Sequence, residues 1–250
     1  MFTRNRIKEI KSLEQKKYRK RMGLFVAEGP KLVLDLLGTF EPVYILVTPR
    51  WLNQHPGVLP QGVETDIVPQ EELTRSSLQQ HPQDILCLFR IPHFEAIMAE
   101  EARHSLVLAL DGVQDPGNLG TIVRLADWFG IRDVFCSPLT ADIYSPKAVQ
   151  ATMGALARVR VHYTNLAEAL QGFQGPVFGT FLGGEDIYRS ELTQQGVIVM
   201  GNEGNGIGAE MAERVTHRLF IPPFPADVPT SESLNVAMAT AITLSEFRRR

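Results

Sequence analysis

Short apolar runs alternate with segments of helical periodicity along most of this 250-residue chain. The run LVLAL at residues 106–110 is apolar at every position, which is typical of a strand covered on both faces. A helical pattern follows over residues 119–129. Further strands are predicted at 134–136, 159–161, 177–181, 197–200 and 219–221, and further helices at 147–156, 166–170 and 234–250. Strands that alternate with helices predict an α/β fold with a mainly parallel sheet flanked by helices.

The first ninety or so residues repeat this alternation on a smaller scale. Residues 5–21 form a basic helical pattern, and Pro30 suits the first turn of a second helix because its missing N–H is not needed there. The remaining predicted elements are strands at 43–47, 63–68 and 85–89 and a helix at 70–78. We expect a small N-terminal α/β domain at residues 1–95, a helical linker at 96–104 and a larger domain at 105–250.

The charge of the chain is distributed unevenly. Residues 1–31 carry ten Lys or Arg and three Glu, whereas the other 219 residues carry fifteen Lys or Arg and twenty-five Asp or Glu. A basic cluster on an otherwise acidic protein predicts contact with a polyanion, although a solvated helix face is the plainer interpretation. The centre of the cluster surrounds Tyr18 and consists of Lys16, Lys17, Arg19, Lys20 and Arg21.

Composition excludes several classes of protein and site. The chain has two cysteines, in no CxxC pair, and six scattered histidines, so neither a disulfide framework nor a metal site is expected. No apolar run approaches the roughly 18 residues of a transmembrane helix, and residues 1–15 lack the apolar core of a secretory signal. We therefore expect a cytoplasmic protein that has no membrane association and needs no metal.

Three segments rich in glycine, asparagine or proline each follow a predicted strand, at residues 115–120, 201–206 and 222–235. Ligands of open α/β sheets bind at the carboxyl ends of the strands, so all three segments are placed where a site is expected. The GxGxxG fingerprint, the Walker A motif and the GxSxG elbow are absent. A nicotinamide-dependent dehydrogenase, a P-loop enzyme and an α/β-hydrolase are therefore disfavoured.

The three segments resemble a known set of motifs. DPGNLGTIVR (115–124), GNEGNGI (201–207) and IPPF…SESLNVAMATAI (221–242) are similar to the three motifs of the SpoU/TrmH family, the RNA ribose 2′-O-methyltransferases of the SPOUT class. SPKAVQATMGAL (145–156) is similar to the family's linking segment, with Thr152 in place of the commoner serine. Residues 4–95 resemble, more loosely, the RNA substrate-binding domain that many members carry.

This resemblance implies a fold, a cofactor and a site. It implies a SPOUT-type parallel sheet with a deep trefoil knot near the C-terminus, a homodimer, and S-adenosylmethionine bound near the knot. The positions that match the family's cofactor contacts, made largely through backbone, are Gly201, Ile221 and Leu234, with Thr180 and Leu182 as further candidates. The positions that match its polar catalytic residues are Asn118, Arg124, Glu203, Ser233 and Asn235.

The chemistry assigns Arg124 a specific task. In this family the matching arginine is often described as the group that activates the ribose hydroxyl. A neutral arginine at pH 7 costs at least ~7 kcal/mol, however, because its pKa lies above 12. We therefore expect Arg124 to act as a bidentate clamp on a phosphate or on the hydroxyl oxygen as the proton leaves.

Plainer interpretations exist for each catalytic candidate. Asn118 and Ser233 suit helix N-caps, Glu203 suits a solvated turn, and Arg124 suits a surface stripe. Ser233 and Asn235 are two residues apart, so on a regular helix they would point to nearly opposite sides.

The combined hypothesis is an enzyme that methylates a ribose 2′-hydroxyl in structured RNA. The resemblance also favours ribosomal RNA over transfer RNA, because the shortest family members that act on transfer RNA tend to lack the N-terminal domain. The alternatives are the same reaction on transfer RNA, or a non-catalytic RNA-binding protein that kept the fold. All five polar positions are intact, which favours the enzyme.

Overall fold

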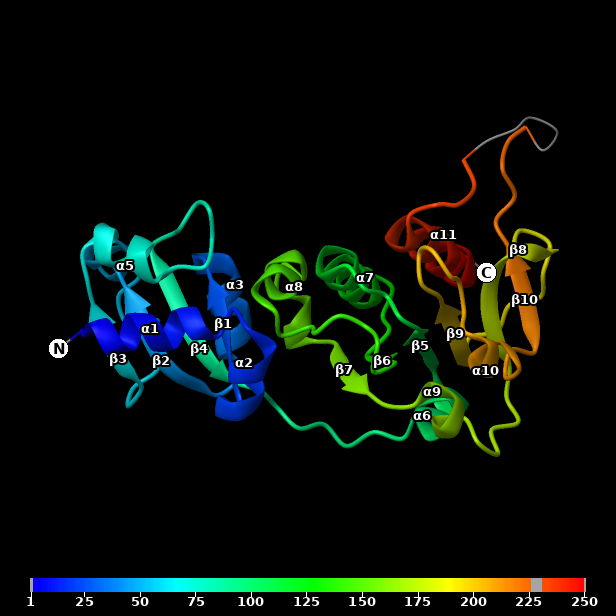
Figure 1. Ribbon diagram of the computed structural model, residues 1–250, viewed down its shortest axis with the longest axis horizontal. Coiled ribbons are helices and arrows are strands. Elements are labelled where there is room, and N and C mark those ends of the chain that lie inside the picture. The colour runs from blue at the N-terminus through cyan, green and yellow to red at the C-terminus, as the bar shows by residue number, and fades with distance from the viewer. Residues whose placement is uncertain (1, 226–230, 250) are drawn as a thin grey trace. The chain divides into compact units, whose positions relative to one another are not determined.

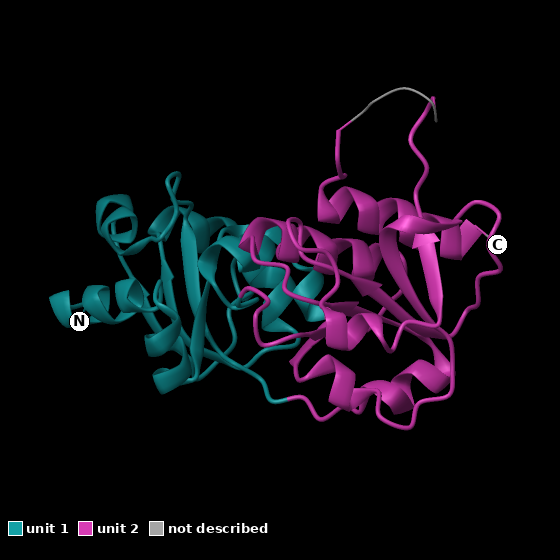
Figure 2. Cartoon of the chain, turned by 45° about the vertical axis from the view of Figure 1, so that its right-hand side comes forward, with its two compact units in different colours: residues 1–93, 142–157 teal, residues 94–141, 158–250 magenta. Residues whose placement is uncertain are grey.

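The computed structural model describes residues 2–225 and 231–249, which form two compact units (Figure 2). The first unit contains residues 1–93 together with residues 142–157. The second contains residues 94–141 and 158–250. A segment from the middle of the chain is therefore part of the N-terminal unit.

The first unit is built on a four-stranded mixed sheet (Figure 1). The strand order is β1-β4-β2-β3, in which β4 runs antiparallel to both neighbours and β2 runs parallel to β3. The elements in chain order are α1 (Arg4–Ser12), α2 (Lys16–Met22), β1 (Leu24–Glu28), α3 (Pro30–Leu37), β2 (Pro42–Val47), α4 (Pro49–Gln54), β3 (Glu64–Ile67), α5 (Gln70–Ser76) and β4 (Ile85–Arg90).

The single helix predicted over residues 5–21 is wrong, because α1 and α2 are separate helices. The Arg19 guanidinium donates 2.7 Å hydrogen bonds to the backbone carbonyls of Leu13 and Glu14, which lie between the two helices. These carbonyls therefore have partners without the helix continuing through them. Strand β1, which directly follows the basic helix, and helix α4 were not predicted from the sequence.

Arg19 is also the residue that ties the inserted segment to the N-terminal elements of this unit. Its Nη2 and Nε atoms donate to Asp142 Oδ2 at 2.7 and 3.1 Å, and the Arg19 residue is only 3% exposed. The Tyr144 ring lies 5.0 Å from that of Phe25, centroid to centroid. The assignment of Arg19 to an RNA-contacting surface therefore needs correction: the other four cations of the cluster are exposed, whereas Arg19 is buried in an ion pair.

The predicted helix at residues 147–156 is interrupted. Helix α8 (Pro146–Ala151) is followed by a separate 3-10 turn, η1 (Ala155–Ala157). Between them Gly154 adopts a φ of 92°, and a Cβ at this position would collide with the Asp35 side chain. The left-handed backbone and the close approach together require glycine here.

The second unit confirms the predicted α/β fold (Figure 1). Its six strands are ordered β10-β8-β9-β5-β6-β7, and every neighbouring pair is parallel. The elements are α6 (Met98–His104), β5 (Leu106–Leu110), α7 (Pro116–Trp128), β6 (Asp133–Cys136), β7 (Arg160–Tyr163), α9 (Leu166–Ala169), β8 (Val177–Asp186), β9 (Gly196–Met200), α10 (Ala209–Ala212), β10 (His217–Phe220) and α11 (Val236–Arg249).

The central strands and the two longest helices set the frame for the site. Every residue of β5 and β9 is buried, as their unbroken apolar sequences predict. Helices α7 and α11 lie side by side and run parallel. Asn235 contacts Asn118 near their N-terminal ends, and Arg248 Nε donates to the carbonyl of Phe129 just after α7, at 2.8 Å. Within residues 2–225 and 231–249, no helix has the length and apolar character that a membrane crossing requires.

The buried pair of Arg19 and Asp142 generates a stability prediction. Replacing Arg19 by Met leaves Asp142 Oδ2 and two backbone carbonyls without the guanidinium donor, so we expect the free energy of unfolding to fall by about 3 kcal/mol. Chemical denaturation measures the change. The exposed neighbour provides the control, since Lys20→Met should stay within about 0.5 kcal/mol of the parent protein. Equal effects of the two substitutions would contradict the assigned role of Arg19.

Candidate active site

Three of the predicted polar residues meet at the carboxyl ends of the strands in the second unit. Asn118 Nδ2 donates to Glu203 Oε1 at 2.7 Å, and Asn235 Nδ2 donates to Asn118 Oδ1 at 3.1 Å. Each residue comes from a different motif: the first turn of α7, the loop after β9, and the residue before α11. The structure therefore brings together side chains separated by as many as 117 residues in the sequence.

The N-terminus of α7 leaves Asn118 available for this contact. Asp115 is the N-cap, because its Oδ1 accepts from the backbone N–H of Asn118 at 2.9 Å, and Pro116 occupies the first turn. The interpretation of Asn118 as the cap is therefore wrong. Its side-chain amide instead faces Glu203 and Asn235.

Asn235 has two roles in the structure. Its Oδ1 accepts from the backbone N–H groups of Ala237 and Met238 at 3.0 and 3.3 Å, which is the N-cap pattern at the start of α11. Ser233 is therefore not the cap, and it is exposed with no hydrogen bond to the described residues. Because α11 begins after Asn235, residues 233 and 235 do not lie on a regular helix, and helical spacing does not force their side chains to opposite sides.

Arg124 is not brought to the other polar residues. It lies on α7 six residues after Asn118, about 9 Å along the helix axis, and it is exposed. It forms no ion pair or hydrogen bond with any residue in the described part of the chain. Trp128, one turn further along α7, is 84% exposed.

The loop that carries Glu203 is tightly closed. Backbone hydrogen bonds of 2.9 Å join residues 202 and 206 in both directions, and a Cβ on Gly201 would collide with the backbone of residues 206–207. The side chain of Asn202 bonds the backbone of the loop and that of Gly112. Sequence reasoning missed Asn202, although an asparagine that opens a glycine-rich turn is a recognised signal for such bonds.

Four of the five predicted cofactor residues lie at three neighbouring strands. Gly201 follows β9, Ile221 follows β10, and Thr180 and Leu182 belong to β8, which lies between β9 and β10 in the sheet. Leu234 directly precedes Asn235, before α11. Strand β8 continues to Asp186, so the prediction that it ends at residue 181 is wrong, and its register with β9 ends at Gly179.

These surroundings fit an adenosyl ligand. The backbone N–H of the buried Gly201 has no hydrogen-bond partner among the described residues, and buried N–H groups in proteins are nearly always paired. Leu182 and Leu234 expose 74% and 48% of their surfaces, which provides apolar area for a base. One backbone donor together with exposed leucine side chains matches the mixed polarity of S-adenosylmethionine.

Other reactive groups of the chain do not join this site. Burial raises the pKa values of the Cys87 and Cys136 thiols, so neither provides a thiolate nucleophile near neutral pH. No cluster of three His, Cys, Asp or Glu residues in the described chain could hold a metal ion.

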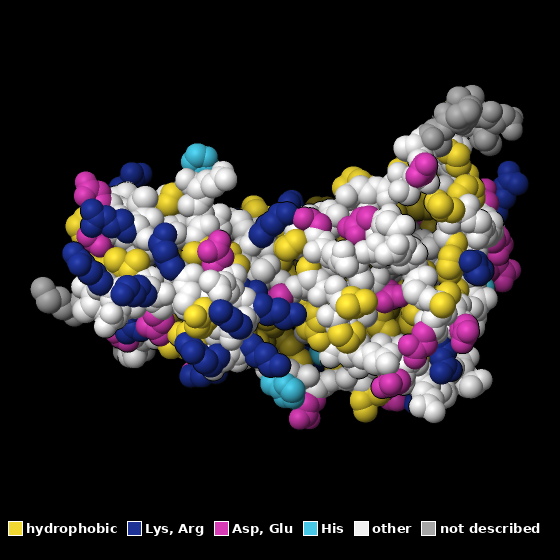
Figure 3. All heavy atoms as spheres, viewed as in Figure 1, with side chains coloured by type: hydrophobic (Ala, Val, Ile, Leu, Met, Phe, Trp, Pro, Cys, Tyr) yellow, Lys and Arg dark blue, Asp and Glu magenta, His cyan; other side chains and the backbone are white. Residues whose placement is uncertain are grey.

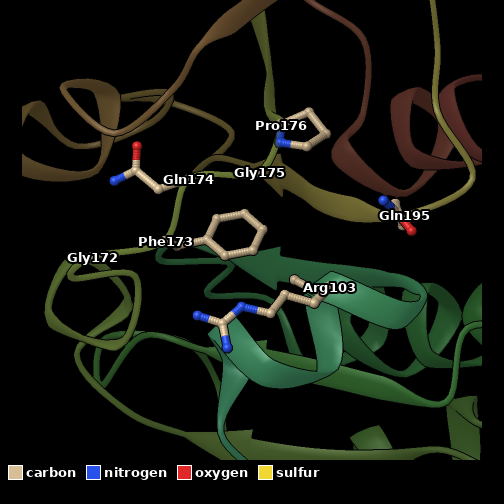
Figure 4. Close-up of a pocket in the computed structure, with 8 residues that line it drawn as sticks. Arg103, Gly172, Phe173, Gln174, Gly175, Pro176 and Gln195 are labelled. Carbon is tan, nitrogen blue, oxygen red and sulfur yellow. The ribbon is translucent and has the colours of Figure 1, made fainter.

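A separate hollow of about 220 Å³ lies in the same unit (Figure 4). Its lining includes Arg103 of α6, Phe173, Pro176 just before β8 and Gln195 just before β9. It therefore lies toward the amino ends of these strands and contains none of the predicted site residues.

Comparison with known proteins agrees with the motif-based interpretation. Residues 105–245 match the family described as the SpoU rRNA Methylase family, and residues 4–87 match the MRM3-like substrate binding domain. The 23S rRNA (guanosine(2553)-2′-O)-methyltransferase RlmP of Bacillus subtilis is 30% identical over 248 residues, covering 97% of this chain and 96% of the relative.

Two solved structures have the same fold over the whole chain. A TrmH-family protein from Porphyromonas gingivalis is 41% identical, with a TM-score of 0.88 and coverage of 100% of this chain and 99% of that one. The AdoMet-bound rRNA methyltransferase from Sinorhizobium meliloti is 29% identical, with a TM-score of 0.87 and coverage of 100% and 96%.

Proposed function

The chain belongs to the SpoU rRNA methylase family, and we propose that it transfers a methyl group from S-adenosylmethionine to a ribose 2′-hydroxyl in ribosomal RNA. The observation that carries this proposal is the contact of Glu203, Asn118 and Asn235, which joins one residue from each of the three family motifs. The B. subtilis and S. meliloti relatives are named as rRNA methyltransferases, which favours ribosomal over transfer RNA.

The residues of the site have mainly a positioning task. The sulfonium methyl of the donor is already electrophilic, so the protein must hold the ribose hydroxyl in line with it. Gly201, Ile221, Leu234, Thr180 and Leu182 are the residues we propose to hold the donor.

The polar groups then hold the ribose. The hydrogen-bonded set of Glu203, Asn118 and Asn235 presents an ordered edge of carboxylate and amide groups toward the sugar. Ser233, which is exposed and two residues before Asn235, and Arg124 complete the proposed contacts to RNA. The planar guanidinium of Arg124 clamps a phosphate or the hydroxyl oxygen as the proton leaves.

Replacing Arg124 by Lys tests this chemistry. Lysine keeps the charge but loses the two-pronged geometry, so we expect turnover to fall on the order of 100-fold at neutral pH. The measurement is transfer of labelled methyl from the donor to ribosomal RNA, scored as alkali-resistant ribose methylation. Near-normal turnover would contradict the clamp. Methylation of transfer RNA alone would reassign the substrate, and RNA binding without transfer by the unaltered protein would support the non-catalytic alternative.

We propose that the first unit holds the RNA through the exposed cations of α2. Lys16, Lys17, Lys20 and Arg21 are all exposed, and Figure 3 shows Lys and Arg side chains gathered over α1 and α2. Two of these cations lie over the Tyr18 ring, with Lys17 Nζ at 5.0 Å and the Arg21 guanidinium carbon at 4.9 Å from its centroid.

Helix α1 adds further exposed cations to the basic surface of α2. Arg4, Lys8 and Lys11 follow the spacing of one helix face and are exposed, whereas Arg6, on the other side, is paired with Glu9 and Glu64.

The salt dependence of RNA affinity tests this surface. Each phosphate contact contributes about 0.7 to 0.9 to the slope of log affinity against log salt, so replacing the four α2 cations by Gln should flatten the slope by about 3. Filter binding between 50 and 200 mM salt measures it. Substitution of the exposed Arg189 and Lys31 by Gln serves as the control and should leave the slope within about one contact. An unchanged slope in the α2 variant would exclude the α2 cations as an RNA-binding surface.

We further propose a homodimer with a knotted C-terminal segment. The support for the knot is the path of the chain: β10 lies at one edge of the sheet, yet the chain returns to place α11 beside α7. The support for the dimer is α7, where Arg124 and Trp128 are one turn apart and exposed. A second copy that covers Trp128 would also surround Arg124.

Substitution of Trp128 by Glu tests the dimer. A charge at the centre of an apolar contact should separate the subunits, which sedimentation velocity detects as a halving of mass. Ile97, 71% exposed and outside α7, provides the matched control, and Ile97→Glu should leave the mass unchanged. A parent protein that sediments as a monomer would exclude the dimer.

Finally, we propose that residues 1–95 form the RNA-binding domain and residues 105–250 the methyltransferase domain, and that the enzyme acts in the cytoplasm. The described packing adds one requirement: residues 142–157 complete the N-terminal unit, so a fragment of residues 1–95 lacks Tyr144 and the partner of Arg19.

A further inference from the structure

We propose that Asn202 is a positioning residue for the methyl transfer: its side chain locks the loop after β9 to the backbone of Gly112 and so holds Glu203 within hydrogen-bond distance of Asn118. This inference rests on the proposed function, because its effect is measured on the same reaction.

The side chain of Asn202 bonds the backbone inside the loop. Asn202 Oδ1 accepts from the backbone N–H groups of Gly204 and Asn205 at 2.8 and 3.0 Å. Both bonds span Glu203, which lies between Asn202 and Gly204 in the sequence. Together with the two backbone bonds between residues 202 and 206, they fix the conformation of the peptide that carries the Glu203 side chain.

The same side chain anchors the loop to the backbone of Gly112. Asn202 Nδ2 donates to the carbonyl of Gly112 at 2.7 Å, two residues beyond the end of β5. The N–H of Gly112 is held in turn by Ser137 Oγ at 2.9 Å and Thr140 Oγ1 at 3.2 Å, in the segment that follows β6. The anchor is therefore tied to the ends of two buried strands.

Gly112 is connected to both partners of the Asn118–Glu203 contact. Gly112 lies three residues before Asp115, which caps the helix that carries Asn118. The chain leads from Gly112 into α7 and so to Asn118. The hydrogen bond from Gly112 to Asn202 leads to the neighbouring Glu203. Both connections end at the 2.7 Å hydrogen bond between Asn118 and Glu203. Glu203 itself is exposed, so packing alone does not fix its side chain.

A second hydrogen bond holds the same segment in place when the Asn202 bond is lost. Asp111 Oδ2 accepts from the backbone N–H of Gly208 at 2.8 Å, and this bond holds the far end of the loop to the β5 end independently of Asn202. Loss of the Asn202 bond should therefore shift Glu203 without detaching the segment.

The test variant is Asn202→Asp. The substitution keeps an oxygen for the N–H groups of Gly204 and Asn205 but places a second oxygen against the Gly112 carbonyl. We expect kcat to fall about 10- to 100-fold, with the KM values for donor and RNA within about twofold of those of the parent protein. Asn205→Ala is the matched control in the same loop, since the Asn205 side chain makes no hydrogen bond to the described residues. Its kcat should stay within about twofold of the parent value.

The pH dependence of kcat distinguishes a misplaced Glu203 from a loss of folding. Protonation of the introduced carboxyl gives it an O–H that can donate to the Gly112 carbonyl, so the ratio of variant to parent kcat should rise as pH is lowered from 8 to 6. The carboxyl groups of Glu203 and Asp111 are present in both proteins, so dividing by the parent rate at each pH removes every pH effect that the two proteins share.

The outcomes separate the two proposals. An active parent protein with an unaffected Asn202→Asp variant, or with a ratio that is flat or falls toward low pH, overturns the positioning role alone. A parent protein that transfers no methyl group to any RNA overturns the proposed function and the positioning role with it. A lowered kcat with the rising ratio, beside a normal Asn205→Ala control, is the result expected.

Discussion

The parallel direction of the six strands in the second unit is the constraint on which the site depends. Parallel strands bring all their carboxyl ends to one edge, so the segments after β5, β9 and β10 emerge at that edge although they are far apart in sequence. The sheet supplies only this proximity. The side chains are fixed by shorter-range bonds: Asp115 capping α7, Asn235 capping α11, and Asn202 bonding the Gly112 carbonyl.

Helices α7 and α11 run parallel because both begin at the edge of the sheet where the strands end. Both helices begin at the site with a capping residue, and both carry a polar side chain into it, Asn118 in one case and Asn235 in the other. Arg248 closes the pair at the opposite end by bonding the carbonyl of Phe129. Because the two helices are fixed at both ends, Asn118 has little freedom to move away from Asn235. Such rigidity suits a reaction in which the protein mainly aligns two reactants.

The first unit depends on a different interaction. One buried arginine, Arg19, ends α1 through two backbone carbonyls and holds the inserted segment through Asp142. Its neighbours on α2 point to solvent and remain available to a polyanion. A single basic run thus contains both a structural cation and the proposed binding cations, and burial alone distinguishes them.

The sequence by itself determined the fold class, the family and most strand positions, since short apolar runs follow directly from burial and the motifs are contiguous. It also named Asn118, Glu203 and Asn235. Only the tertiary structure decided that Asp115 rather than Asn118 caps α7 and that Asn235 rather than Ser233 caps α11. It also decided that Arg19 is buried, that Asn202 bonds the Gly112 carbonyl, and that Arg124 does not contact the other polar residues. The burial of Arg19 and the bond from Asn202 to Gly112 depend on which distant groups lie within hydrogen-bond distance of a side chain, and local spacing carries no information on that distance.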